Sequence, residues 1–241
     1  MSCKSIIFLF FILTLAVAGN AQDGNKTQVK PLYQFLHIQN DLKNGFVNQS
    51  FTKENTQGSP YLLAHWAKGQ ITLNNNEVAG DSGKVLNYDK LKHALVLKVE
   101  EKGALLVNMQ PIKSFTLEDT SVTYNFVKVP EISGDYVMQL YGNSGYALYK
   151  LVKTKFYKSD YENAGLYEKG YKYDRYEDEA TYFIKDGTGK YINLHSAGKS
   201  DLKRLAASVP EVNKFLQQQK IPEDMDQYLV KLVSFLAENE K

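Results

Sequence analysis

The sequence predicts a mainly β protein, in which an antiparallel meander sheet forms an open barrel or a sandwich and is followed by a C-terminal cluster of short α-helices. Apolar and polar residues alternate through much of residues 61–194, which is the pattern of half-buried strands. Short turn sequences interrupt this alternation, and such connections leave no room for crossover helices. After Gly198 the apolar spacing becomes helical, which predicts the C-terminal cluster.

Residues 1–21 have the three parts of a cleavable export signal. Lys4 supplies a positive start, residues 6–15 form an apolar run, and small residues lead to an expected cleavage site after Ala21. The run is shorter than the roughly 20 residues that cross a bilayer, and the only cysteine, Cys3, precedes the run instead of following it. We therefore expect an exported protein with no stable membrane anchor after cleavage, located in the periplasm, at the cell surface or outside the cell.

The composition of the exported part excludes several classes of chemistry. No cysteine remains after cleavage, so we expect no disulfide, thiolate metal site or thiol nucleophile. The whole chain has 29 Lys and Arg against 27 Asp and Glu, and this balance gives no reason to expect binding to nucleic acid. The four histidines, His37, His65, His93 and His195, do not have metal-binding spacing. We expect neither a metal nor a cofactor.

The exported chain divides into three expected parts. Residues 22–30 are polar and fit a disordered leader. Residues 31–198 form the expected β domain, although residues 31–45 fit either a helix, which we favour, or an edge strand. Alternation is clearest in residues 122–126, 136–140 and 191–194. Asn and Gly, which tolerate positive φ, predict tight turns at residues 74–76, 101–103, 142–145 and 186–189.

Residues 199–241 form the expected helical segment, packed on the sheet. Ser200 is placed to cap a first helix, and Ser208 with Glu211 has the spacing of a capping box for a second. Pro222 is placed to start a third helix. In that third helix apolar residues recur on one face: Met225, Tyr228, Leu229, Leu232 and Leu236. Such a stripe favours packing against the sheet over binding a partner.

A group of loosely spaced residues supports the assignment of export and β architecture. The chain contains Gly-Ser-Pro-Tyr at residues 58–61, then Trp66, Gly-x-Ile-x-Leu at residues 69–73, Leu-x-Tyr-Asp at residues 86–89, and Phe115. A Tyr-rich segment and a Lys-rich helical end follow. From about Gly58 onward the chain resembles small exported β-rich proteins of Bacteroidota. This resemblance implies export and a β-rich fold, and it carries no functional residue.

Three short strings resemble catalytic or phosphate-binding motifs without their structural context. Residues 80–83 read Gly-Asp-Ser-Gly, as around a serine-protease nucleophile, but His65 is too close in sequence for a fold that places the two residues on separate barrels. We interpret the string as a hairpin turn. Residues 198–200 and 186–190 lack the first glycine of a phosphate-binding loop and are interpreted as a helix start and a turn. No catalytic residue is assigned.

The most unusual composition lies between residues 136 and 191, which contain most of the 17 tyrosines. Residues 157–179 show little alternation and are interpreted as a long connection, a type of segment that is often functional. The candidate ligand-binding residues are Tyr161, Tyr167, Tyr171, Tyr173 and Tyr176. The acids beside them are Asp160, Glu162, Glu168, Asp174, Glu177, Asp178 and Glu179.

Three functions are compatible with these features. The one we favour is a noncatalytic binding or interaction protein of the cell envelope, with an unknown envelope ligand or protein as its partner. The second is a carrier of an apolar ligand inside an open barrel. The third is a hydrolase that uses two carboxylates of the Tyr-rich connection. Tyrosines and acids also occur on solvated sheet faces without any binding role, and we favour a protein that is not an enzyme.

Overall fold

The computed structural model describes residues 29–32, 46–47, 55–99, 103–143, 145–163, 167–219 and 224–239. The expected export signal, nearly all of the expected leader and most of the expected helix within residues 31–45 lie outside these ranges. Among the described residues, no helix combines the length and the apolar character that crossing a membrane requires.

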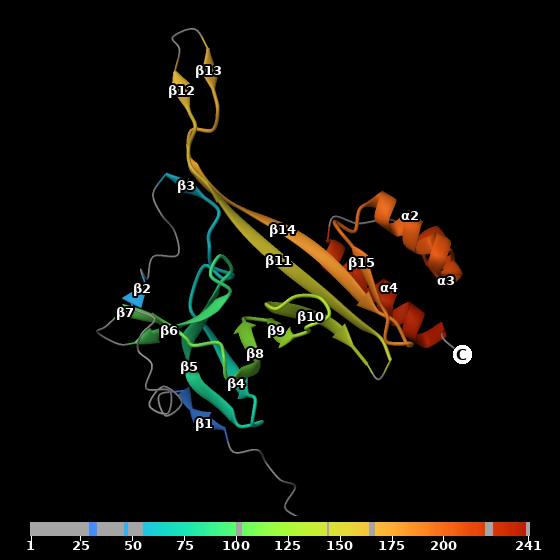
Figure 1. Cartoon of the computed structure of the whole chain (residues 1–241), viewed down its shortest axis with the longest axis horizontal. Helices are drawn as coiled ribbons and strands as arrows, with labels where there is room; N and C mark the ends of the chain where they lie inside the picture. The colour runs from blue at the N-terminus through green and yellow to red at the C-terminus, as the bar shows by residue number, and fades with distance from the viewer. Residues whose placement is uncertain are drawn as a thin grey trace, which may run out of the picture.

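The protein is mainly β, as predicted, and its main sheet is open (Figure 1). Within the described ranges, eleven strands of this sheet follow the order β15-β14-β11-β10-β9-β8-β4-β5-β6-β7-β2, and two more lie off this path, β1 beside β5 and β3 beside β14. The strands are β1 (Lys30–Pro31), β2 (Phe46–Val47), β3 (Thr56–Gln57), β4 (Ala67–Leu73), β5 (Val78–Asp89), β6 (Ala94–Val99), β7 (Gly103–Leu106), β8 (Ile112–Asp119), β9 (Val122–Lys128), β10 (Tyr136–Gly142), β11 (Ala147–Tyr157), β14 (Asp174–Lys185) and β15 (Tyr191–Leu194). A separate small hairpin consists of β12 (Glu162–Asn163) and β13 (Glu168–Lys169).

Consecutive strands pair as an antiparallel meander in two runs, from β4 to β7 and from β8 to β11. The sheet is nevertheless mixed, because β1 pairs with β5 and β3 pairs with β14 in parallel. Tight turns form at residues 74–76 and 186–189, as expected. In the second turn the Asp186 side chain accepts hydrogen bonds from the backbone N–H groups of Thr188 and Lys190.

The string at residues 80–83 does not form the expected turn, because it lies inside β5. Ala67 pairs with Leu86 while Gly69 pairs with Asp81, so β5 carries an irregularity between these two pairs. At Gly69 a Cβ atom would lie 2.1 Å from the carbonyl oxygen of Thr116 on the neighbouring β8. Small residues therefore mark a close backbone approach and a bulge here.

The long connection expected at residues 157–179 is largely strand. β11 and β14 pair continuously from Ala147 with Lys185 to Tyr157 with Arg175. Tyr176, Asp178 and Glu179 therefore belong to β14, and the connection shrinks to residues 158–173. In this segment, the first six residues of β14 are all half-buried or exposed, on both faces of the strand. The apolar–polar alternation by which a strand is recognised is weak in such a ribbon.

Three helices follow the sheet: α2 (Lys199–Ser208), α3 (Pro210–Gln218) and α4 (Met225–Asn239). The expected capping box of α3 is wrong. The Ser208 hydroxyl bonds back to the carbonyl oxygens of Arg204 and Leu205 within α2, and Pro210 opens α3 at a position that suits proline. Ser200 lies inside α2, whose N-terminal neighbour is Gly198. Asp224 accepts a hydrogen bond from the Gln227 N–H at the start of α4, while Pro222 lies outside the described residues.

The two largest hydrophobic cores of the described structure hold this arrangement. The first lies within the curved sheet of β4 to β10 and is centred on stacked Phe115 and Phe126, whose ring centroids are 4.5 Å apart. The second lies between the helices and the β10-β11-β14-β15 part of the sheet. There Leu148 and Ile184 from the sheet meet Leu232 of α4 in one buried cluster. The apolar stripe of α4 is thus buried against the sheet, and the three helices cover one end of the ribbon (Figure 1).

Candidate functional site

The β11–β14 ribbon extends beyond the rest of the sheet and ends in the small β12–β13 hairpin (Figure 1). We call the described residues of 156–176 the arm. Three of its tyrosines are unusually open to solvent: Tyr167 is 78% exposed, Tyr171 57% and Tyr173 38%. Large aromatic side chains in such positions contribute little to a core, so these three tyrosines are the candidates for contact with another molecule.

Tyr171 is held in place at the base of the arm by a cation. The guanidinium carbon of Arg175 lies 3.7 Å from the ring centroid of Tyr171 and 4.6 Å from that of Tyr157. Arg175 also donates from Nε to Glu177. Stacking between a guanidinium and two aromatic rings limits the motion of all three side chains, so the arm presents Tyr171 in a defined position.

The other two predicted site residues have structural contacts of their own. A hydrogen bond to Glu168 raises the pKa of Tyr161, which joins the two sides of the small hairpin. Tyr176 lies in β14, with its ring centroid 4.9 Å from that of Phe156. The structure therefore brings the five predicted tyrosines onto one arm, with three of them strongly exposed.

Acids of the arm and of the adjoining ribbon support the local structure. Asp160 accepts a hydrogen bond from the backbone N–H of Tyr171 at 2.7 Å, and Asp174 accepts one from the backbone N–H of Ser159 at 2.9 Å. Glu179 forms an ion pair with Lys155 at 2.6 Å. Each of these carboxylates has a separate donor, which is the pattern of loop and ribbon stabilisation.

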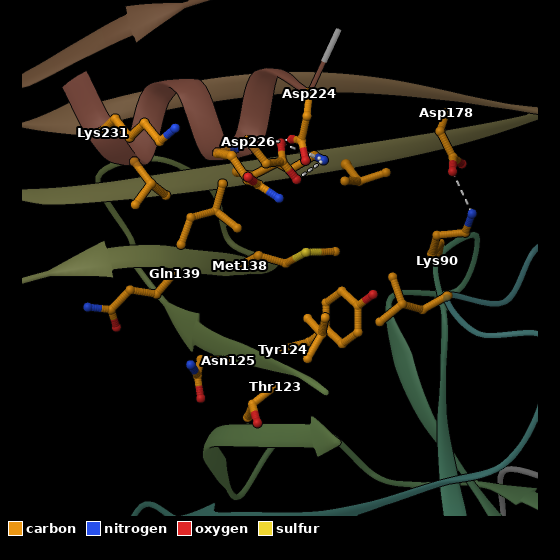
Figure 2. Close-up of a pocket in the computed structure, with 17 residues that line it drawn as sticks. Lys90, Thr123, Tyr124, Asn125, Met138, Gln139, Asp178, Asp224, Asp226 and Lys231 are labelled. Atoms are coloured by element: carbon orange, nitrogen blue, oxygen red, sulfur yellow. Dashed lines mark hydrogen bonds and ion pairs between the residues drawn. The ribbon is translucent and has the colours of Figure 1, made fainter. Parts of the chain in front are cut away.

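A second candidate site is a groove of about 660 Å³ that lies beside α4 (Figure 2). β9, β10 and β11 supply its floor, the start of α4 supplies one wall, and Lys90 with Asp178 lies at one end. Its apolar residues are Leu62, Val122, Tyr124, Met138, Leu140, Val152 and Val230. Concave sites that combine an apolar floor with a few polar groups are the usual form of ligand sites.

The wall of the groove contains a closed polar cluster. Lys150 Nζ donates to both carboxylate oxygens of Asp226, at 2.9 and 2.7 Å. The Tyr182 hydroxyl donates to the same carboxylate at 2.5 Å. Burial, followed by this hydrogen bond, raises the pKa of Tyr182 above its ordinary value. The cluster satisfies its own charges and gives the groove a rigid polar edge.

The histidines remain apart in the described structure. His65 Nε2 lies 3.2 Å from Asp119 Oδ1 at the surface, His93 occupies a turn with φ of 52°, and His195 is exposed. His37 lies outside the described residues. Within the described ranges no group of three or more His, Cys, Asp or Glu side chains could hold a metal ion.

Comparison with known proteins adds no functional information. No protein-family model, no curated protein and no solved structure matches this chain. The arm and the groove must therefore be interpreted from their own chemistry.

Sequence reasoning found the arm and missed the groove. The arm has a local signal, a dense run of tyrosines. The groove combines residues from β9, β10, β11 and α4, and its Lys150–Asp226 pair joins positions 76 residues apart. The sequence pattern closest to the groove is the alternation of Val122, Tyr124 and Phe126. It predicts that these side chains share one face of a strand, but it does not predict a groove on that face.

Proposed function

We propose that this chain is an exported, noncatalytic binding protein of the cell envelope that holds its ligand through the tyrosines of the arm. The observation that carries the proposal is the exposure of Tyr167, Tyr171 and Tyr173 on a projecting hairpin with its own hydrogen bonds. Tyrosine offers a large and amphipathic surface that loses little conformational entropy on binding. A projecting arm can reach an extended ligand that a flat surface could not follow.

A glycan of the envelope is the ligand class that this surface favours. The cations and acids of the arm are nearly balanced in number, so charge gives little attraction to anionic polymers. Flat aromatic faces beside hydrogen-bonding groups suit the apolar and polar faces of a sugar ring. The hydrolase alternative gains no support, because Asp160, Asp174 and Glu179 each make a separate structural contact.

Retention on isolated envelope glycan tests this proposal. The exported form should be retained, and the triple variant Tyr167→Ala, Tyr171→Ala, Tyr173→Ala should lose retention while keeping its circular dichroism and unfolding midpoint. A triple Phe variant at the same positions keeps the rings and should retain much of the binding if stacking dominates. Val29→Ala, which shortens an exposed apolar side chain directly before β1, at the opposite end of the molecule from the arm (Figure 1), is the matched control. Unchanged retention by the triple Ala variant would refute the role of the arm.

Export is tested separately by sequencing the N-terminus of the protein recovered from producing cells. A chain that begins at Gln22 and is found outside the cytoplasm supports the proposal. An uncleaved chain recovered in the cytoplasm would contradict export without bearing on the chemistry of the arm.

A further inference from the structure

The groove lies where the sheet splits between β9 and β10. β9 pairs with β8 along its length, from Val122 with Asp119 to Val127 with Ser114. With β10 it pairs at only three positions, Phe126, Val127 and Lys128. Beyond Met138, β10 diverges, and its ladder with β11 is irregular between Gln139 and Tyr141. Residues 122–125 therefore have a strand neighbour on one side only, and we call them the free half of β9.

The free half of β9 leaves main-chain hydrogen-bonding groups facing the groove. In an antiparallel strand, alternate residues direct both N–H and C=O toward opposite neighbours. β8 pairs with the main-chain groups on one side of residues 122–125. The main-chain groups on the other side point into the split, and no described residue forms a hydrogen bond with them. Unpaired edges of this kind bind an added strand unless they are covered.

The side chains around the split suit an extended peptide. Tyr124, Leu140 and Val152 form an apolar surface, and Val122, at the start of β9, is 50% exposed. Lys90 and Lys150 are already paired with Asp178 and Asp226. Lys231 has no ion pair among the described residues and lines the groove at the end away from Lys90 (Figure 2). A carboxylate on the ligand would complement this cation.

We propose that the groove binds an extended peptide segment that adds a strand to the free half of β9. About four residues of the segment pair with residues 122–125, apolar side chains at alternate positions pack on Tyr124 and Leu140, and an acidic side chain meets Lys231. An acyl chain would fill the apolar floor but leave the main-chain groups of β9 unpaired. An extended peptide covers the apolar floor and also pairs with the main-chain groups of β9. This site is separate from the arm and does not depend on the arm's function.

A set of capped hexapeptides tests the pairing directly. The first peptide alternates valine with threonine and has glutamate in place of one threonine. Two matched peptides carry N-methyl groups on alternate backbone nitrogens, one peptide on the odd-numbered residues and the other on the even-numbered residues. Only one of these two sets of nitrogens faces β9. Methylation of that set should weaken binding about tenfold or more, because hydrogen bonds are lost and the strands are forced apart. Methylation in the other register should change the affinity little.

Amide hydrogen exchange locates the added strand. Binding of the unmodified peptide should slow exchange at alternate amides within residues 122–125 of the exported form. Equal binding of both methylated peptides, absence of peptide binding, or binding without this protection would each overturn the proposal. Binding of palmitate, with no peptide binding, would instead identify the groove as a site for an amphiphile and would equally refute strand addition.

Charge reversal tests the proposed acidic position. Lys231→Glu should weaken binding of the glutamate peptide and strengthen binding of the corresponding lysine peptide. Lys214→Glu makes the same charge change at an exposed position of α3 that does not line the groove, and it should leave both affinities nearly unchanged. If the two variants behave alike, the charge complementarity assigned to Lys231 is wrong.

Discussion

At the scale of single residues, two buried tyrosines in the first core, Tyr88 and Tyr136, differ in the partner of the hydroxyl group. The Tyr136 hydroxyl lies 2.7 Å from the carbonyl oxygen of Ile112 and 3.1 Å from that of Met109. The Tyr88 hydroxyl is buried and has no hydrogen-bond partner among the described residues. Both rings pack on Phe115, so the two positions share their packing environment. The same substitution at each position therefore isolates the effect of the hydrogen bond.

Replacing each tyrosine with phenylalanine should change stability in opposite directions. Tyr136→Phe should lower the free energy of unfolding by about 1–2 kcal/mol, because it removes a donor from buried carbonyl groups. Tyr88→Phe should raise it by up to about 1 kcal/mol, because it removes a buried group that pays for desolvation without a bond. Urea denaturation of both variants measures these changes. Equal losses at both positions would show that the Tyr88 hydroxyl has a partner in solution.

Buried tyrosines also make stability depend on alkaline pH. Burial raises the pKa of Tyr88, Tyr136 and Tyr182 in the folded protein, whereas in the unfolded chain a tyrosine titrates near its ordinary value of about 10. Above that pH the unfolded state binds fewer protons than the folded state, so stability falls as pH rises. Below about pH 10 these tyrosines are protonated in both the folded and the unfolded state, so their full contribution to stability is present.

The expected loss is up to about 1.4 kcal/mol per pH unit for each such tyrosine. Urea denaturation between pH 8 and pH 11.5 measures it, with tyrosinate absorbance as a second readout. Tyr88→Phe should show a shallower decline than the unchanged chain, which separates the tyrosine effect from the loss of lysine charge in the same range. Identical slopes for the two proteins would contradict a raised pKa at Tyr88.

At the scale of elements, the sequence predicts those features that depend only on residues close together in the chain. The Asn-rich turn after β4 and the Asp-Gly turn after β14 follow from residues that tolerate tight turns, and the α4 stripe follows from helical spacing. The capping box failed because Ser208 bonds within the helix that it ends, an option equally open to a serine hydroxyl. The Tyr157–Glu179 segment was misassigned because a ribbon exposed on both faces lacks the alternation of a half-buried strand.

The packing of α4 on the sheet predicts a large effect of core truncation in this helix. Leu232 is fully buried in the second core, so Leu232→Ala should lower the free energy of unfolding by about 2–5 kcal/mol. Lys231→Ala, at the neighbouring exposed position, should change it by less than about 0.5 kcal/mol. Chemical denaturation compares the two variants. A small effect of Leu232→Ala would indicate that the stripe contributes little to the fold.

At the scale of the whole molecule, residues that are distant in the sequence come together to form the groove. Lys90, in the turn after β5, reaches Asp178 of β14 across 88 residues of sequence, and β3 pairs with β14 near the same place. No local pattern predicts such contacts, because either partner alone looks like an ordinary surface charge. The meander could be predicted, but the groove that these distant segments form could not.

The Lys90–Asp178 pair should therefore contribute more to stability than a neighbouring pair on the same ribbon. The Lys90 side chain is only 9% exposed, and Asp178 accepts from it at 2.6 Å and from the Thr154 hydroxyl at 2.6 Å. Asp178→Asn leaves the buried ammonium group without a countercharge and should cost about 1–3 kcal/mol. Glu179→Gln breaks the Lys155–Glu179 pair, in which both side chains are more than half exposed, and should cost less than about 0.5 kcal/mol.

Urea denaturation gives the stability difference, and amide exchange shows where the structure loosens. In Asp178→Asn, exchange should accelerate in the turn after β5 and around β3, because these segments meet β14 beside the pair. In Glu179→Gln it should stay unchanged there. Added salt should reduce the effect of Glu179→Gln more than that of Asp178→Asn, since ions screen a pair with two exposed side chains more than a pair whose lysine is buried. If both variants lose equally little stability and respond equally to salt, then backbone pairing, and not the Lys90–Asp178 pair, holds β3 and the turn after β5 against β14.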